Sequence, residues 1–141
     1  TENEGMARTA FEVAKGVFVS EVPWIQHPTI ANAGCSPDGL IDDDLGLVEL
    51  KCPNTKTHIE YILKGEPPKT YLNQMMWQMA CTGRSYVDFV SYDPRLPVDL
   101  ELFVARLERD EDHIQLITEE VIIFDNEVTQ LVNKLKELRN V

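Results

Sequence analysis

Residues 35–53 constrain the fold of this chain more than any other stretch, because two strand-like segments there enclose a run of acids. The segment reads CSPDGLIDDDLGLVELKCP. Residues 33–41 and 46–52 look like two strands, and the three aspartates at 42–44 form a polar turn between them. The pattern predicts a β-hairpin that carries acidic side chains close to its ends.

The remaining periodicities predict helices and further strands around this hairpin. In chain order they are a helix over 2–15, a strand over 17–25 bent at its proline, helices over about 56–64 and 70–82, strands over 85–92 and 99–108, and a helix within 110–140. Gly16 and Gly83 are expected to end helices, and Asn54 to cap one. This order predicts the α/β class, with a central mixed β-sheet flanked by helices. At 141 residues the chain suits a single domain, 1–141.

Composition excludes several classes of protein. No apolar run is long enough to span a membrane, and no secretory signal is visible at the start of the chain. The three cysteines show no CxxC spacing, which argues against a disulfide framework or a zinc site and favours the reducing cytoplasm. His27, His58 and His113 are scattered, so ordinary packing or surface roles are expected for them.

The charge distribution is uneven. The net charge of −11 argues against a general DNA-binding surface, because phosphate contacts need Lys and Arg. Residues 99–127, however, hold ten acids and two arginines, whereas residues 51–69 hold four lysines and two glutamates. A locally basic face beside the hairpin is therefore compatible with the acidic total.

Asp38 and Glu49 are the candidate chemical centre of the hairpin. Directly opposed residues on antiparallel strands have Cβ atoms about 4.5–5.5 Å apart, so the hairpin can bring these two carboxylates together. Side chains alternate along a strand, which puts Lys51 on the same side as Glu49 and turns Leu50 into the core. Two carboxylates, a main-chain carbonyl and an ammonium group suit a hard divalent cation such as Mg²⁺.

A purely structural interpretation remains open at this point. Pro-Asp-Gly is a common turn sequence, and Glu-x-Lys is a common exposed strand pattern. Glu4 could pair with Arg8 one helical turn further on. A calcium loop starting at Asp42 fits poorly, because its twelfth position, which should be Glu, falls on Pro53.

Several motifs together resemble the lambda-exonuclease-like, viral-type recombinase family of PD-(D/E)xK nucleases. The motifs are GCSPDGL, LVELKCP, YLNQMMWQM and YDPR, and the likeness extends from Glu4 to Arg95. The resemblance implies a restriction-endonuclease-like core. It also implies that Asp38, Glu49 and the Leu50 carbonyl hold Mg²⁺, for which Mn²⁺ can substitute, with Glu4 near the metal.

The resemblance implies roles for residues around the metal as well. Lys51 would position and polarise the attacking water. Tyr71 and Gln74 match a Tyr-x-x-Gln motif of the family and would contact phosphate or that water, and Gln78, one turn later, is a lesser candidate. Without the resemblance, these three residues read as the polar edge of a core helix.

The leading hypothesis is a Mg²⁺-dependent exonuclease that degrades one strand of linear duplex DNA, 5′ to 3′, in phage-type homologous recombination. By resemblance, its partners would be duplex DNA ends and a single-strand annealing protein, and it would assemble as a trimeric ring. Family members carry a segment before the helix of Glu4 that holds the 5′ phosphate, and the chain is expected to lack it. The alternative is a catalytically silent nuclease fold that binds DNA ends or a recombination partner.

Overall fold

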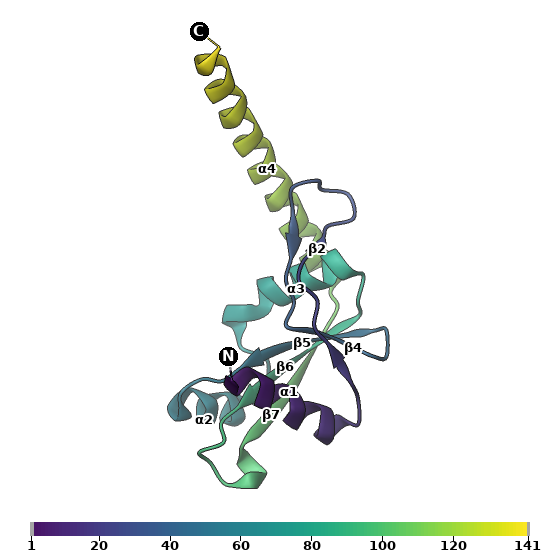
Figure 1. Cartoon of the computed structure of the whole chain (residues 1–141), viewed down its shortest axis with the longest axis vertical. Coiled ribbons are helices and arrows are strands. Elements are labelled where there is room, and N and C mark those ends of the chain that lie inside the picture. The colour runs from purple at the N-terminus through teal and green to yellow at the C-terminus, as the bar shows by residue number, and fades with distance from the viewer. Residues whose placement is uncertain (1, 141) are drawn as a thin grey trace.

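The computed structural model describes residues 2–140 and contains a central sheet, covering helices and one long helix that extends away from the body (Figure 1). The elements are α1 (Glu2–Lys15), β1 (Val19–Ser20), β2 (Ile25–Gln26), β3 (Gly34–Cys35), β4 (Gly39–Ile41), β5 (Gly46–Lys51), α2 (Thr55–Lys64), α3 (Leu72–Thr82), β6 (Tyr86–Tyr92), β7 (Leu102–Glu108) and α4 (Glu111–Arg139), with 3₁₀ turns at Lys69–Tyr71 and Val98–Leu100.

The central sheet has the order β1-β4-β5-β6-β7. Only β5 and β6 run parallel, with Glu49 beside Phe89, and the other neighbouring pairs are antiparallel. The predicted mixed sheet is therefore confirmed. Every residue of β6 is buried although its sequence alternates, because helices cover both faces of the sheet at its centre.

Two apolar clusters hold these helices to opposite faces of the sheet. On one face, Ala7 and Phe11 of α1 pack against Val48, Leu50 and Val90. On the other face, a second cluster joins α3 and the start of α4 to the alternate strand residues: Leu47, Met75, Met76, Met79, Val87, Phe89 and Ile114. Because successive strand residues point to opposite faces, β5 contributes to both clusters.

Two of the predicted strands were wrong in extent. Residues 17–25 and 33–41 each divide into two short strands, and β2 pairs with β3 in a separate two-stranded sheet. Pro23 and Pro37 lie at these divisions, where proline cannot supply a ladder N–H. A Cβ at Gly34 would lie 2.4 Å from the Trp24 ring, so only glycine lets β3 approach the segment of β2 this closely.

The predicted helix ends agree with the structure. Gly16 and Gly83 have φ of 67° and 73°, the left-handed conformation that ends a helix. The Asn54 side chain accepts a hydrogen bond from the Thr57 N–H at 2.9 Å. The helix expected within 110–140 begins after Asp110, whose carboxylate accepts from the N–H groups of the first turn. The strand expected over 99–108 starts later, at Leu102, because a 3₁₀ turn precedes it.

The histidines and cysteines have the ordinary environments that the sequence indicates. His58 is fully buried between the Ser91 hydroxyl and the Leu100 carbonyl, and His27 stacks on Trp77. All three cysteines are free. None of the helices within residues 2–140 combines the length and the apolar character needed to cross a membrane.

Candidate active site

The hairpin of β4 and β5 brings Asp38 to the side of Glu49. Gly39 pairs with Val48 in the antiparallel register, so the residue before Gly39 lies opposite the residue after Val48. The Leu50 N–H donates a hydrogen bond of 2.7 Å to Asp38 Oδ2. The N–H and C=O of a residue in an antiparallel strand point to the same side, so the Leu50 carbonyl also faces Asp38. The Asp38 carboxylate and the Leu50 carbonyl thus lie on the β4 side of β5, next to Glu49 in the strand.

Glu49 is almost completely buried yet well supplied with donors. Its side chain is 2% exposed. Oε1 lies 3.1 Å from Lys51 Nζ and accepts from Gln74 Nε2 at 3.1 Å, while Oε2 accepts from Gln78 Nε2 at 3.0 Å. These donors offset the cost of burying a carboxylate and fix its orientation.

The packing of α3 explains why two glutamines reach Glu49. Gln74 and Gln78 are one turn apart and share a face of the helix. Met75 and Met79 occupy the neighbouring face and are fully buried against the sheet. The sequence predicts Gln78 only as a lesser candidate than Gln74, but both side chains contact Glu49 directly. The i,i+4 spacing from Gln74 was the signal that pointed to it.

Gln78 also carries an unusual acceptor. Its side chain is 2% exposed, and its Oε1 atom is buried without a hydrogen-bond partner among the described residues. Buried polar atoms in native proteins are nearly always paired, with protein groups, water or ions. A polar ligand or water at the Glu49 site would therefore satisfy an existing acceptor.

Lys51 and Tyr71 lie together beside Glu49. The Lys51 ammonium is 4.4 Å from the centre of the Tyr71 ring, a cation–π contact. Burial lowers the pKa of Lys51, but the charge and hydrogen bond of Glu49 raise it more, so the pKa lies above its ordinary value. Lys51 is therefore a cation at neutral pH, able to donate hydrogen bonds but not to remove a proton.

Asp38 has the most perturbed carboxyl group of the site. Burial and then the negative charge of Glu49 raise the pKa of Asp38 to about 6, against the opposing Leu50 N–H bond. The charge of Glu4 on α1 contributes in the same direction, so Glu4 lies within electrostatic reach of Asp38. Arg8, considered from the sequence as a partner for Glu4, lies 2.5 Å from the Glu21 carboxylate.

These residues fit a divalent cation by the chemistry of their donors. Among residues 2–140, no group of three or more His, Cys, Asp and Glu side chains forms a ready metal cage. Mg²⁺, however, is commonly held by one or two carboxylates and completes its shell with water and substrate oxygens. After burial, the negative charge of Glu49 is the next cause that raises the pKa of Asp38, and a cation between the two carboxylates would offset this repulsion.

Comparisons with known proteins agree with the fold and the motifs. The family described as the YqaJ-like viral recombinase domain matches residues 1–85. The crystal structure of an alkaline exonuclease (LHK-Exo) from Laribacter hongkongensis is 51% identical, with a TM-score of 0.92 over 96% of this chain and 70% of that chain. The same enzyme in complex with dAMP gives 51% identity and a TM-score of 0.91, over 96% and 69% of the two chains.

A more distant structure shares the fold. A phage-related exonuclease from Haemophilus somnus 129PT is 17% identical, with a TM-score of 0.73 over 95% of this chain and 70% of that chain. No curated protein matches in a sequence comparison. The structural matches confirm the predicted restriction-endonuclease-like α/β fold.

Proposed function

The chain belongs to the YqaJ-like viral recombinase domain family, and from this premise we propose that it is a metal-dependent DNA exonuclease of the phage recombination type. The observation that carries the proposal is the buried Glu49 carboxylate beside Asp38 and Lys51. Burying one acid beside a second acid is costly for a purely structural strand, so the pair favours a functional role.

In the proposed mechanism, Asp38, Glu49 and the Leu50 carbonyl hold a divalent cation, with Glu4 close by. When bound, the cation would lower the pKa of water and offset charge on the phosphate. Lys51 donates hydrogen bonds to the attacking water and to the charge that develops on the phosphate, a role consistent with its raised pKa.

The helix α3 and the turn before it supply the positioning groups. Gln74 and Gln78 hold the Glu49 carboxylate in one orientation, which fixes the site before substrate arrives. Tyr71 orients Lys51 through its ring, and we assign Tyr71 to contact with a substrate phosphate or the water. No step requires a general base from Lys51.

We further propose Mg²⁺ as the working ion, with Mn²⁺ as a substitute, and degradation of one strand from its 5′ end in the cytoplasm. A single-strand annealing protein would then receive the exposed strand, and a ring of three copies would encircle the duplex. The family resemblance supports these details. The net charge of −11 is compatible with them if the lysines at 51–69 face the DNA.

The experiment uses a linear duplex with one fluorophore at the 5′ end of one strand and another at its 3′ end. We expect Mg²⁺-dependent release of mononucleotides, early loss of the 5′ label, no cutting of closed circular DNA, and no activity in EDTA. Asp38→Ala should be inactive, whereas Asp42→Ala, on the exposed turn of the same hairpin, should retain full activity. Binding of duplex ends without turnover in Mg²⁺ or Mn²⁺ would instead support a silent DNA-binding module.

A further inference from the structure

Two of the three cysteines, Cys35 on β3 and Cys81 on α3, lie together in the interior of the protein. Their side chains are 8% and 4% exposed, and the Cys81 thiol is the hydrogen-bond partner of the Cys35 sulfur. Both are free thiols. They are far apart in the sequence, so this contact exists because α3 packs against β3. Two thiols in direct contact can be joined by oxidation into a disulfide.

The packing of β3 on α3 holds the two sulfur atoms near one another. Trp77 Nε1 donates a hydrogen bond of 3.0 Å to the carbonyl of Gly34, the residue before Cys35. Trp77 lies one helical turn before Cys81, so both residues are on the same side of α3. The Trp77 ring also stacks on His27, with the ring centres 5.1 Å apart. These contacts fix the strand on the helix, so the approach of the two thiols needs no further ordering of the chain.

The hydrogen bond between the two thiols gives them different reactivity. It lowers the pKa of Cys35, against the opposing effect of burial, and it raises the pKa of Cys81 together with burial. Cys35 is therefore the sulfur that ionises more readily, and the thiolate is the form that reacts with oxidants. Its small exposed fraction favours a small oxidant, such as a peroxide, over a bulky disulfide.

We propose that Cys35 and Cys81 form a peroxide-sensitive pair that closes into a disulfide and displaces Asp38. In the first step the Cys35 thiolate attacks an oxygen of hydrogen peroxide, the O–O bond breaks, and Cys35 becomes a sulfenic acid as hydroxide leaves and is protonated to water. In the second step the Cys81 sulfur attacks the Cys35 sulfur, the S–O bond breaks, and the S–S bond forms. The Cys81 proton leaves with the departing hydroxide as water. The two thiols together lose two electrons and two protons, and the peroxide is reduced to two molecules of water.

On the strand side, the bond acts on Asp38. A disulfide S–S bond is about 2.0 Å long, shorter than a hydrogen bond between two sulfur atoms, so oxidation draws Cys35 toward α3. Only Ser36 and Pro37 separate Cys35 from Asp38, and the fixed φ of proline makes this connection stiff. A shift of Cys35 therefore moves the Asp38 carboxylate relative to the Leu50 N–H, from which it accepts a hydrogen bond of 2.7 Å. The effect on activity rests on the proposed function, in which Asp38 holds the cation, whereas the formation of the bond does not.

On the helix side, the bond acts through Gln78. Cys81 follows Gln78 by three residues, so the two side chains are neighbours on the surface of α3. Gln78 donates a hydrogen bond of 3.0 Å to Glu49 Oε2. Strain on this turn of the helix therefore disturbs the orientation of the buried Glu49 carboxylate.

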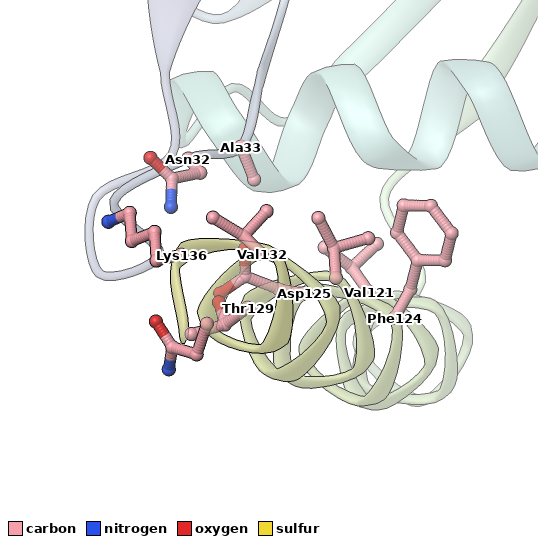
Figure 2. A pocket seen from close by; sticks show the side chains of 10 residues that line it. Asn32, Ala33, Val121, Phe124, Asp125, Thr129, Val132 and Lys136 are labelled. Carbon is pink, nitrogen blue, oxygen red and sulfur yellow. The ribbon is translucent and has the colours of Figure 1, made fainter. Parts of the chain in front are cut away.

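The loop that leads into β3 has room for this movement. Asn32 and Ala33 border a groove of about 400 Å³ whose opposite wall is α4. Figure 2 shows the two residues facing Val121 and Val132 across this groove. Close-packed side chains resist displacement, whereas a loop beside an open groove can shift without overpacking its neighbours. The loop before β3 is thus the part that yields when the bond forms.

The test treats the reduced full chain with hydrogen peroxide, removes the peroxide with catalase, and digests the alkylated protein with trypsin. We expect a disulfide between peptides 16–51 and 70–84, which contain Cys35 and Cys81. Nuclease activity in Mg²⁺ should fall at least roughly tenfold and return with dithiothreitol, because a misplacement of about 1 Å in an active site costs up to about 100-fold. Cys35→Ser and Cys81→Ser should each keep their untreated activity after peroxide. The matched control, Cys52→Ser, should form the same bond with the same loss and recovery.

Three results would overturn the proposal. One is wild-type protein in which the two peptides stay separate after peroxide, with Cys35 either unchanged or converted to a sulfinic acid. Another is full nuclease activity in protein whose disulfide has formed. The third is inhibition by peroxide that persists in Cys35→Ser. The peptide readout needs neither a serine variant that folds nor an active nuclease. If the reduced chain cleaves no DNA, the proposed function fails, and the linked peptides together with a loss of Mn²⁺ affinity in calorimetry still decide the inference.

Discussion

Replacing Asp38 by Asn should make the metal-free protein more stable while removing its nuclease activity. The folded protein holds the Asp38 carboxylate next to Glu49, partly buried, where charge on both is unfavourable. Asn keeps an oxygen that can accept the 2.7 Å hydrogen bond from the Leu50 N–H, but it removes the charge. The change therefore relieves repulsion without removing the contact that joins the two strands.

The size of the effect follows from the pKa of Asp38. Burial and the Glu49 charge raise this pKa from 3.8 to about 6. At about 1.4 kcal/mol per tenfold change in proton affinity, the charged form would be disfavoured by about 3 kcal/mol in full burial. Asp38 is only partly buried, so solvent screening reduces the expected gain of Asp38→Asn to about 1–2 kcal/mol at pH 8.

The effect should depend on pH with a definite sign. The folded protein binds the Asp38 proton more tightly than the unfolded chain does, so wild-type protein loses stability as the pH rises from 3.8 through 6. Asn does not titrate. The advantage of Asp38→Asn should therefore be complete at pH 8 and nearly absent at pH 4.

The assay is urea unfolding in EDTA at the two pH values, followed by circular dichroism. Asp42→Asn is the matched control, since it makes the same chemical change on the exposed turn and should stay within about 0.5 kcal/mol of wild type. Added Mg²⁺ should stabilise wild type more than Asp38→Asn, which lacks one of the proposed ligands. The reasoning would be refuted if Asp38→Asn were less stable than wild type at pH 8 in EDTA. It would also be refuted if the gain in stability of Asp38→Asn were as large at pH 4 as at pH 8.

Three further predictions concern neighbouring groups. Lys51→Met should lower kcat by about a hundredfold or more while metal binding, measured by calorimetry, changes only a few-fold; unchanged kcat would remove Lys51 from the mechanism. Gln78→Met should lower the free energy of unfolding, measured by urea denaturation, by about 1–3 kcal/mol, because buried Glu49 loses a hydrogen-bond donor. A variant as stable as the wild type would contradict this prediction. Hydrogen bonds from Arg95 hold the pKa of Asp93 at about 2, so Asp93→Asn should lower the Tm at pH 7. The difference in Tm from wild type should shrink as the pH falls from 4 to 2, because the Asp93 carboxylate of the wild type is then protonated. A difference in Tm that stays constant over this range would contradict the prediction.

The parts of the site that depend on local geometry could be predicted from the sequence. Strand alternation alone puts Glu49 and Lys51 on one side and Leu50 in the core, and the structure has them so. The hairpin turn follows equally from the run of aspartates: Asp43 Oδ1 accepts from the N–H groups of Leu45 and Gly46 at 2.9 Å. These contacts involve neighbours in the sequence, so the local pattern determines them.

The parts of the structure that depend on contacts between residues far apart in the sequence could not be predicted. The pairing of β2 with β3 rests on two residues in each strand and on the close approach of Gly34 to Trp24. No periodicity marks strands this short. The contact of Gln78 with Glu49 depends on how α3 lies across β5, which the helix pattern alone leaves open.

The two carboxylates of the site are held by secondary structure of different stability. Glu49 belongs to a six-residue strand between two sheet neighbours, whereas Asp38 sits just outside a three-residue strand. Backbone amides near Asp38 should exchange with solvent through local opening, and those of β5 only when the whole domain unfolds. On warming, Asp38 should therefore lose its position beside Glu49 while the core of the domain is still folded.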